Sequence, residues 1–150
     1  MSEAAAAAAS VGEPAWQRQG RKSGIVHLGV GAFHKAHQAV YTDDAIAASG
    51  GDWMITGVSL RSPDVADALN PQDGIYTLLT RGEDGVTARR IGSIRRVLVA
   101  PRERQAVLEA LAAPETKIVS LTITEKGYGR DAGTGGLERK HPAISADLVN

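Results

Sequence analysis

Apolar and polar positions divide the chain into short apolar runs and longer periodic segments. Residues 25–30 form the first apolar run, and its β-branched side chains suit a strand that is buried on both faces. Residues 35–49 follow as an amphipathic helix that Gly50 and Gly51 should end. Residues 53–60 are expected to form a second strand. The apolar stripe of the helix would consist of Ala36, Ala39, Val40, Ile46 and Ala47.

Shorter elements are expected beyond residue 60. Ser62 and Pro63 are typical of a helix start, as cap and first helical residue. Two later strands should pair as a hairpin around the turn at residues 83–85. The expected elements are a helix at 62–69, a turn at 70–74, strands at 75–80 and 86–94, a helix at 101–112, a strand at 117–123 and a short helix at 142–149.

This order of elements indicates an α/β fold, with a mainly parallel sheet and an inserted β-hairpin. About three parallel strands can be counted, whereas a complete dinucleotide-binding domain has about six. The sequence therefore predicts an incomplete N-terminal domain. Residues 1–22 should form a disordered leader before it, with Trp16 docking on the body.

A glycine turn follows the first strand. Gly29 and Gly31 occupy the first two glycine positions of the G-x-G-x-x-G pattern that holds a dinucleotide pyrophosphate, and His34 stands at the third. Glycines at these positions allow a tight turn and a close approach of the phosphates. The short pattern leaves a second interpretation open, in which the glycines serve backbone shape alone.

The longer string G-V-G-A-F-H-K-A-H-Q-A-V-Y, from Gly29 to Tyr41, resembles the polyol-specific long-chain dehydrogenases. The resemblance continues through Gly57–Asp64 and Ser120–Tyr128 and covers roughly residues 24–150. It identifies residues 23–150 as the N-terminal part of an NAD-binding Rossmann-like domain. The family's lysine base, with its asparagine and histidine partners, belongs to a second, helical domain that is not in this chain, so no catalytic residue is expected here.

The resemblance implies an oxidoreductase that moves a hydride between NAD and a sugar alcohol or keto sugar, without a metal. D-mannitol and D-fructose are the expected pair, and D-mannonate and D-fructuronate are the alternative. A non-catalytic nucleotide-binding module and a methyltransferase-like domain are alternatives of other classes. The expected partner is thus a small polyol or keto sugar.

The resemblance also assigns candidate cofactor-binding residues. His34, in place of glycine, should loosen the contact between helix and sheet and could supply a side-chain hydrogen bond near the cofactor. Asp64, after the second strand, is expected at the ribose hydroxyls and predicts a preference for NAD over NADP, although the neighbouring Arg61 could accept a 2′-phosphate. The pyrophosphate turn would comprise Gly29, Gly31, Ala32, Phe33 and His34.

Three other residues carry weaker hypotheses. Glu125 follows a central strand and could conduct protons between the active site and water, or be a solvated loop carboxylate. His34 and His37 have a spacing compatible with a metal, but no nearby carboxylate or cysteine completes a set. His27, inside the first strand, is expected to be a hydrogen-bonded core or edge histidine.

Composition narrows the possible partners, cross-links and location of the protein. The 17 basic and 17 acidic side chains cancel, which indicates neither a nucleic-acid nor a membrane-surface partner, and the local arginine stretch from Arg89 to Arg104 is expected to be a solvated face or a domain contact. No cysteine is present, which excludes disulfides. The run Ala4–Ala9 lacks the basic segment of a signal peptide, so a cytoplasmic location is the default.

Overall fold

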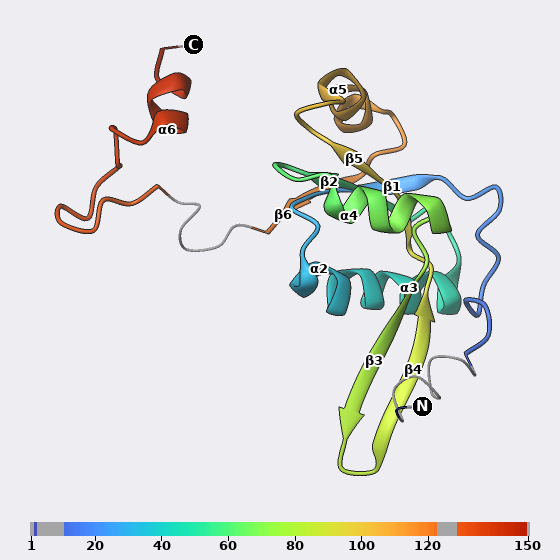
Figure 1. Cartoon of the computed structure of the whole chain (residues 1–150). Helices are drawn as coiled ribbons and strands as arrows, with labels where there is room; N and C mark the ends of the chain where they lie inside the picture. Colours follow the sequence, from blue (N-terminus) through green and yellow to red (C-terminus); the bar gives the residue numbers. More distant parts are fainter. Residues whose placement is uncertain (1, 3–10, 123–128, 150) are drawn as a thin grey trace.

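The computed structural model describes residues 2, 11–122 and 129–149 (Figure 1). A four-stranded parallel sheet forms the centre, in the order β5-β2-β1-β6. Its strands are β1 (Ser23–Leu28), β2 (Met54–Ser59), β5 (Ile94–Val99) and β6 (Ile118–Leu121). The other elements are α2 (Ala32–Ala36), α3 (Gln38–Ser49), α4 (Asp64–Leu69), η1 (Asn70–Gln72), β3 (Tyr76–Gly82), β4 (Gly85–Ile91), α5 (Arg104–Ala112) and α6 (Pro142–Asp147).

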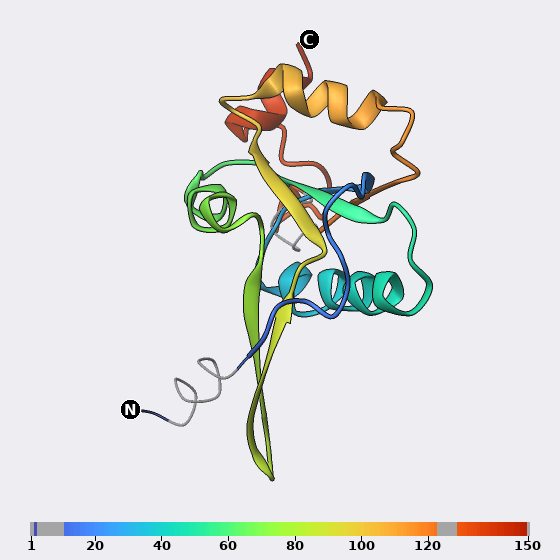
Figure 2. The same ribbon diagram turned by 90° about the vertical axis from the view of Figure 1, so that its right-hand side faces the viewer.

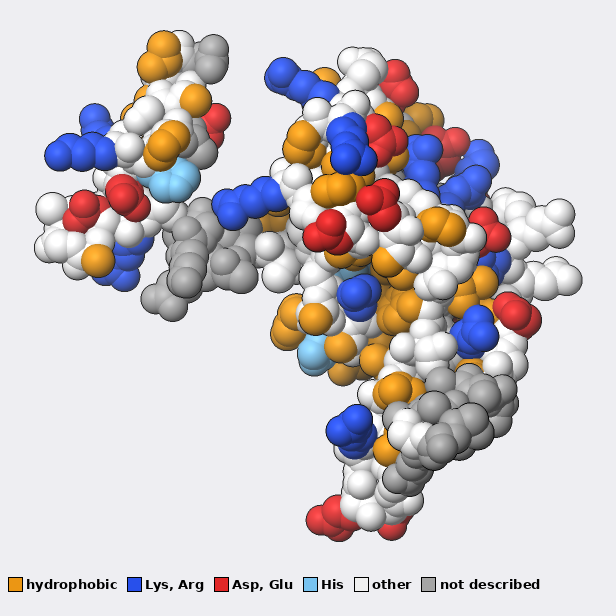
Figure 3. Space-filling view, in the orientation of Figure 1, with side chains coloured by type: hydrophobic (Ala, Val, Ile, Leu, Met, Phe, Trp, Pro, Cys, Tyr) orange, Lys and Arg blue, Asp and Glu red, His pale blue; other side chains and the backbone are white. Residues whose placement is uncertain are grey.

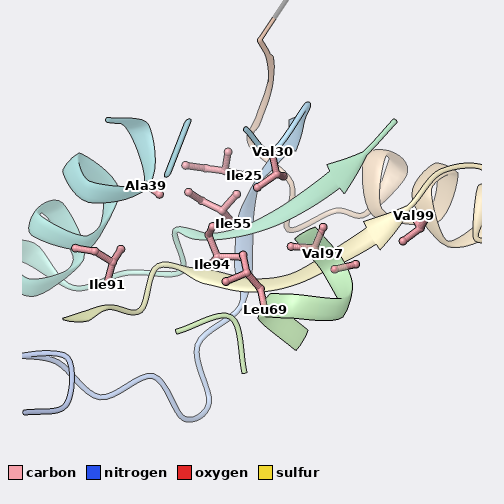
Figure 4. Packing of buried hydrophobic residues seen from close by; sticks show 10 residues of the cluster. Ile25, Val30, Ala39, Ile55, Leu69, Ile91, Ile94, Val97 and Val99 are labelled. Atoms are coloured by element: carbon pink, nitrogen blue, oxygen red, sulfur yellow. The ribbon is translucent and has the colours of Figure 1, made fainter. Parts of the chain in front are cut away.

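Helices cover both faces of this sheet, with α5 on one side and α2 and α3 on the other (Figure 2). Successive residues of a strand point to opposite faces, so Ile25 and Val26 enter different cores. Ile25 packs in the larger core with Ile55 and Leu69 (Figure 4). Val26 packs with Val58, Leu98 and Val107 of α5. Burial on both faces explains the unbroken apolar runs of β1 and β2.

The register of the sheet determines where the glycine turn lies. Leu28, the last residue of β1, is opposite Val58 of β2 on one side and Leu121 of β6 on the other. The turn that begins at Gly29 therefore emerges between the carboxyl ends of two neighbouring strands. Ligands of open α/β sheets bind at this edge.

The α/β fold with a mainly parallel sheet and an inserted hairpin is confirmed. The hairpin β3–β4 pairs from Tyr76 and Ile91 to Gly82 and Gly85, with the turn between the last two, and it projects from the body in Figure 1. Gly50, with a φ of 70°, ends α3, as predicted.

Two of the boundaries predicted between residues 86 and 112 are wrong. The strand expected at 86–94 ends at Ile91, and a separate strand, β5, runs from Ile94 to Val99 beside β2. The helix expected at 101–112 begins only at Arg104, because the chain first leaves β5 through a turn. The sheet consequently has one more parallel strand than the sequence indicated.

The helix expected at 35–49 is interrupted at His37, whose φ of −126° and ψ of −85° are not helical. The interruption changes which side chains face the core. Ala36 and Ala47 are exposed, and the buried face of α3 comprises Ala39, Thr42, Asp43 and Ile46. Helix α4 begins at Asp64, one residue later than a first helical Pro63, and its first N–H donates to the Ser62 hydroxyl at 3.1 Å.

The described part of the leader lies against the domain. As predicted, Trp16 docks on the body, and its indole N–H donates to the Asp43 carboxylate at 3.1 Å. Arg18 donates to the carbonyls of Gly92 at 2.8 Å and Ile94 at 3.0 Å. Trp16 and Arg18 are thus held in place by these hydrogen bonds, within the segment 1–22 that the sequence predicted to be a disordered leader. Residues 1 and 3–10 lie outside the described part of the chain, and a disordered leader stays a prediction there.

Candidate functional site

Gly29 is required by the backbone of the turn itself. Its φ of 93° lies in the left-handed region, and its N–H donates to the Val58 carbonyl at 2.8 Å. A Cβ at this position would lie 3.0 Å from the Thr122 carbonyl oxygen. The close packing of β1, β2 and the residue after β6 therefore explains this glycine without any ligand.

Gly31 differs, because nothing in the described fold requires a glycine there. Its φ of −103° and ψ of −174° are accessible to any residue, and an added Cβ would meet no atom within 4 Å. Gly31 precedes α2, so it opens the space in front of the helix N-terminus. A side chain at this position would fill the space that a bound group needs to approach the backbone.

The first turn of α2 supplies the N–H groups of Ala32, Phe33 and His34, and a helix start leaves such donors without intrahelical partners. The Phe33 side chain points outward and is 65% exposed. It stacks on the His37 ring at 4.3 Å, and the His37 Nδ1 donates to the Phe33 carbonyl at 2.9 Å. The turn thus combines backbone donors with an exposed aromatic surface.

The His34 side chain turns the other way, into the sheet. It is fully buried, and its ring stacks on His27 of β1 with a centroid distance of 3.8 Å and an interplanar angle of 12°. The sequence predicted a looser contact between helix and sheet at this position. In the structure, the two stacked rings occupy the space between them. Because the side chain faces the sheet, it does not point toward a ligand in the turn, and only its backbone N–H remains available there.

A chain of hydrogen bonds continues from this pair to β6. The His34 Nδ1 donates to the Gln38 Oε1 at 3.2 Å, and the Gln38 Nε2 donates to the Ser120 hydroxyl at 3.1 Å. The Ser120 hydroxyl donates to the His27 Nδ1 at 2.9 Å. The His27 Nε2 then donates to the Thr122 hydroxyl at 3.0 Å. This set of donors and acceptors leaves both rings neutral.

Burial also favours the neutral rings. It lowers the pKa of His34 to about 4, with a further contribution from His27 and an opposing one from the Gln38 hydrogen bond. The pKa of His27 is lowered by burial as well, against a hydrogen bond to the Gly29 backbone that raises it. His27 is therefore a hydrogen-bonded core histidine, as predicted.

Asp64 lies at the same sheet edge as the turn. It is exposed at the start of α4, after the carboxyl end of β2. Arg61, also exposed, lies between the strand and the helix. The placement at the ends of neighbouring strands agrees with the position expected for ribose recognition.

The remaining candidate residues do not join this site. Glu125 lies outside the described residues. His34 and His37 point apart, and no group of three or more potential metal ligands occurs in residues 2, 11–122 and 129–149. No helix in this described part of the chain is long and apolar enough to cross a membrane.

Part of the arginine stretch is paired with acidic side chains. Arg89 pairs with Asp43 at 3.0 Å and with Asp44 at 2.5 Å. On the face shown in Figure 3, Lys and Arg side chains lie among Asp and Glu side chains. Hollows of about 350 and 390 Å³, both bordered by Arg95, include residues at the amino ends of β1, β2 and β5, the end of the sheet opposite the glycine turn.

Sequence reasoning missed Gln38, Ser120 and Thr122 as neighbours of the turn. The hydrogen bonds of Ser120 and Thr122 to His27, and of Ser120 to Gln38, depend on the pairing of β1 with β6, which brings together residues more than 80 positions apart. One local signal was present, since a histidine inside an apolar strand needs a polar partner nearby.

The strand order, the glycine turn and the helices on both faces define a Rossmann-type nucleotide-binding domain. Its family follows from comparison with known proteins. The family model described as the mannitol dehydrogenase Rossmann domain matches residues 23–149, and the chain belongs to this family. Membership disagrees with the methyltransferase-like alternative.

Several relatives share this part of the molecule. The chain is 51% identical to mannitol 2-dehydrogenase of Aspergillus fumigatus, over 97% of its own length and 30% of that protein. It is 46% identical to the enzyme of Pyrenophora tritici-repentis, covering 93% of this chain and 25% of that protein. The chain thus spans about a quarter to a third of the length of the curated relatives it matches.

Solved structures agree with this placement. The Pseudomonas fluorescens mannitol 2-dehydrogenase in ternary complex with NAD and D-mannitol superposes with a TM-score of 0.83 and 43% identity, over 99% of this chain and 31% of that one. A D-sorbitol dehydrogenase in substrate-free form gives a TM-score of 0.83 and 38% identity, over 97% of this chain and 31% of that one.

Proposed function

We propose that this domain binds NAD for an oxidoreductase that interconverts a sugar alcohol and its keto sugar, with D-mannitol and D-fructose as the substrate pair. The family of the chain supports the class of reaction. The named substrate and cofactor of the Pseudomonas fluorescens relative support the particular pair. NAD would supply the nicotinamide carbon that accepts or gives the hydride.

Gly31 is the observation that carries the cofactor assignment. The fold leaves open space where its side chain would be and does not need its conformational freedom. A pyrophosphate bound by the N–H groups of Ala32 and Phe33 would occupy that space. Asp64, at the end of the neighbouring strand, would accept hydrogen bonds from the ribose hydroxyls and repel a 2′-phosphate.

The test is the dissociation constant for NADH of the wild-type chain and of Gly31→Leu. The leucine should weaken NADH binding at least about 100-fold, by occupying the approach to the turn, while circular dichroism and the melting temperature stay unchanged. Gly82→Leu is the matched control, because Gly82 at the hairpin end also has no atom within 4 Å of an added Cβ. Equal NADH affinity in Gly31→Leu and wild type would refute the assignment.

Substrate choice is tested separately, on the protein that carries this domain. With NADH as coenzyme, D-fructose should be reduced faster than D-fructuronate. Reduction of D-fructose should also be faster with NADH than with NADPH. A preference for D-fructuronate would replace the proposed substrate and leave the NAD assignment intact. NADH binding without turnover of either sugar would favour the non-catalytic module. A cytoplasmic location, the default from the N-terminal sequence, stays a prediction.

A further inference from the structure

The third position of the glycine pattern suggests a role for the two buried histidines. Glycine at that position normally lets the helix approach the strand closely. Here His34 occupies the position, and His27 of β1 lies directly against it at 3.8 Å. A large side chain is thus accommodated by a flat partner on the strand below, which makes the two histidines a matched pair.

We propose that the stacked pair His27–His34 is a positioning device for the cofactor turn. The pair, tied through Gln38 to Ser120, holds the Gly29–Gly31 turn and the start of α2 in register with the end of β6. The proposal rests on the proposed NAD function for its consequence in binding. Its structural part, the ordering of the turn, stands on the contacts alone.

The geometry supports this role in two ways. Both rings are at least 98% buried, so the stack cannot rearrange without opening the contact between helix and sheet. The hydrogen bonds also join three separate segments: the junction of α2 and α3 at Gln38, β1 at His27, and the end of β6 at Ser120 and Thr122. The Gly29–Gly31 turn lies between these anchored segments, and a Gly31 N–H bond to the Gly29 carbonyl at 2.9 Å keeps it tight.

The protonation state of the two rings is consistent with a positioning role. The His34 Nε2 is buried and has no hydrogen-bond partner among the described residues. As the unprotonated nitrogen of a neutral ring it is an unpaired acceptor, whereas a second proton would make it a buried, unpaired donor beside another imidazole. His27 is the titratable group that stacks on it, and Gln38, which bonds its Nδ1, and Ser120, which bonds Gln38, are uncharged.

The decisive variant is His34→Gly, which restores the usual third glycine. If His34 is only a tolerated replacement, this variant should bind NADH as well as wild type or better. If the pair positions the turn, NADH binding should weaken at least about tenfold, at a temperature where both proteins are fully folded.

A second variant, Gln38→Met, interrupts the hydrogen-bond chain outside the turn and should also weaken NADH binding. His141→Gln, an exposed histidine outside the turn and its contacts, is the matched control and should change the dissociation constant less than about twofold.

A second measurement needs no cofactor. The amide hydrogen of Gly31 should exchange with solvent at least about ten times faster in His34→Gly than in wild type, and at the wild-type rate in His141→Gln. Unchanged exchange in both His34→Gly and Gln38→Met would overturn the positioning role, whatever the affinity for NADH. Failure of the wild-type chain to bind NADH would instead refute the proposed function, and the exchange rates would still decide the role of the pair. His34→Asn serves in place of His34→Gly if the latter does not fold.

Discussion

At the scale of single residues, His34 makes stability depend on pH. Its pKa is about 4 in the folded protein, whereas an unfolded histidine has a pKa of about 6.5. Between these values the unfolded chain binds more protons, so the free energy of unfolding falls as the pH is lowered through this window. The expected loss is about 2–3 kcal/mol, complete below pH 4 and absent above about pH 7.

Urea unfolding at a series of pH values checks this expectation. Carboxylates titrate in part of the same range, so the informative quantity is the difference between wild type and His34→Asn. The variant should lose the pH-dependent part that belongs to the pair, and His37→Asn, which alters an exposed ring, should keep it. Parallel pH profiles for wild type and His34→Asn would show that the buried ring contributes nothing.

The residues of the turn also show what a sequence can and cannot tell. The positions of Gly29 and Gly31 are visible in the pattern, yet only the structure separates the glycine that the backbone needs from the one it does not. From the sequence, the His34 side chain could have supplied a hydrogen bond near the cofactor, whereas in the structure it faces the sheet. Its direction depends on what lies beneath it, and that neighbour, His27, was identified only as a core residue of its own strand.

At the scale of elements, Asp43 joins three segments that are far apart in the sequence. Although it lies on α3, its carboxylate is 2% exposed and accepts hydrogen bonds from the Gly92 N–H at 2.8 Å, the Trp16 indole at 3.1 Å and Arg89 at 3.0 Å. Asp43→Ala would leave the buried Gly92 N–H without this acceptor. The free energy of unfolding should therefore fall by about 2–4 kcal/mol.

Asp44 provides the control within the same ion pair. It contacts the same Arg89 at 2.5 Å, but its side chain is 53% exposed, so Asp44→Ala should cost less than about 1 kcal/mol. Denaturant unfolding of both variants measures the two effects. A similar loss in Asp43→Ala and Asp44→Ala would mean that the buried hydrogen bonds of Asp43 add nothing to the exposed pair.

Asp43 also explains why the helix prediction was only partly right. The stripe predicted for residues 35–49 assumed one uninterrupted helix with apolar residues inward, and an aspartate was not expected on that face. The break at His37 and the partners from Gly92, Arg89 and Trp16 make its burial possible. These partners are distant in sequence. The same limit applies to β5: Gly92 and Ser93 stand between the hairpin strand and the sheet strand, but the pairing with β2 that makes Ile94–Val99 a separate strand is not visible in the local sequence.

At the scale of the whole molecule, the parallel sheet gathers the candidate cofactor residues. Gly29, Gly31 and Asp64 follow β1 and β2, and strands that run the same way must end at one edge. This consequence of topology is why a candidate site could be placed from strand order and a short motif. The boundaries of the helices and strands could not be predicted in the same way, because each depends on packing between distant segments.

The same sheet predicts how the isolated chain behaves at high concentration. In the described residues β6 pairs only with β1, and it leaves three apolar side chains 45–52% exposed, namely Ile118, Val119 and Leu121. An unpaired strand edge with apolar flanks favours edge-to-edge association.

We expect the average mass from sedimentation equilibrium to rise with protein concentration. The double variant Val119→Lys, Leu121→Lys should reduce that rise. Leu60→Lys, which alters a residue of similar exposure (52%) outside β6, should leave association unchanged. If Leu60→Lys reduces association as strongly as the β6 variant, general surface hydrophobicity rather than the strand edge is responsible.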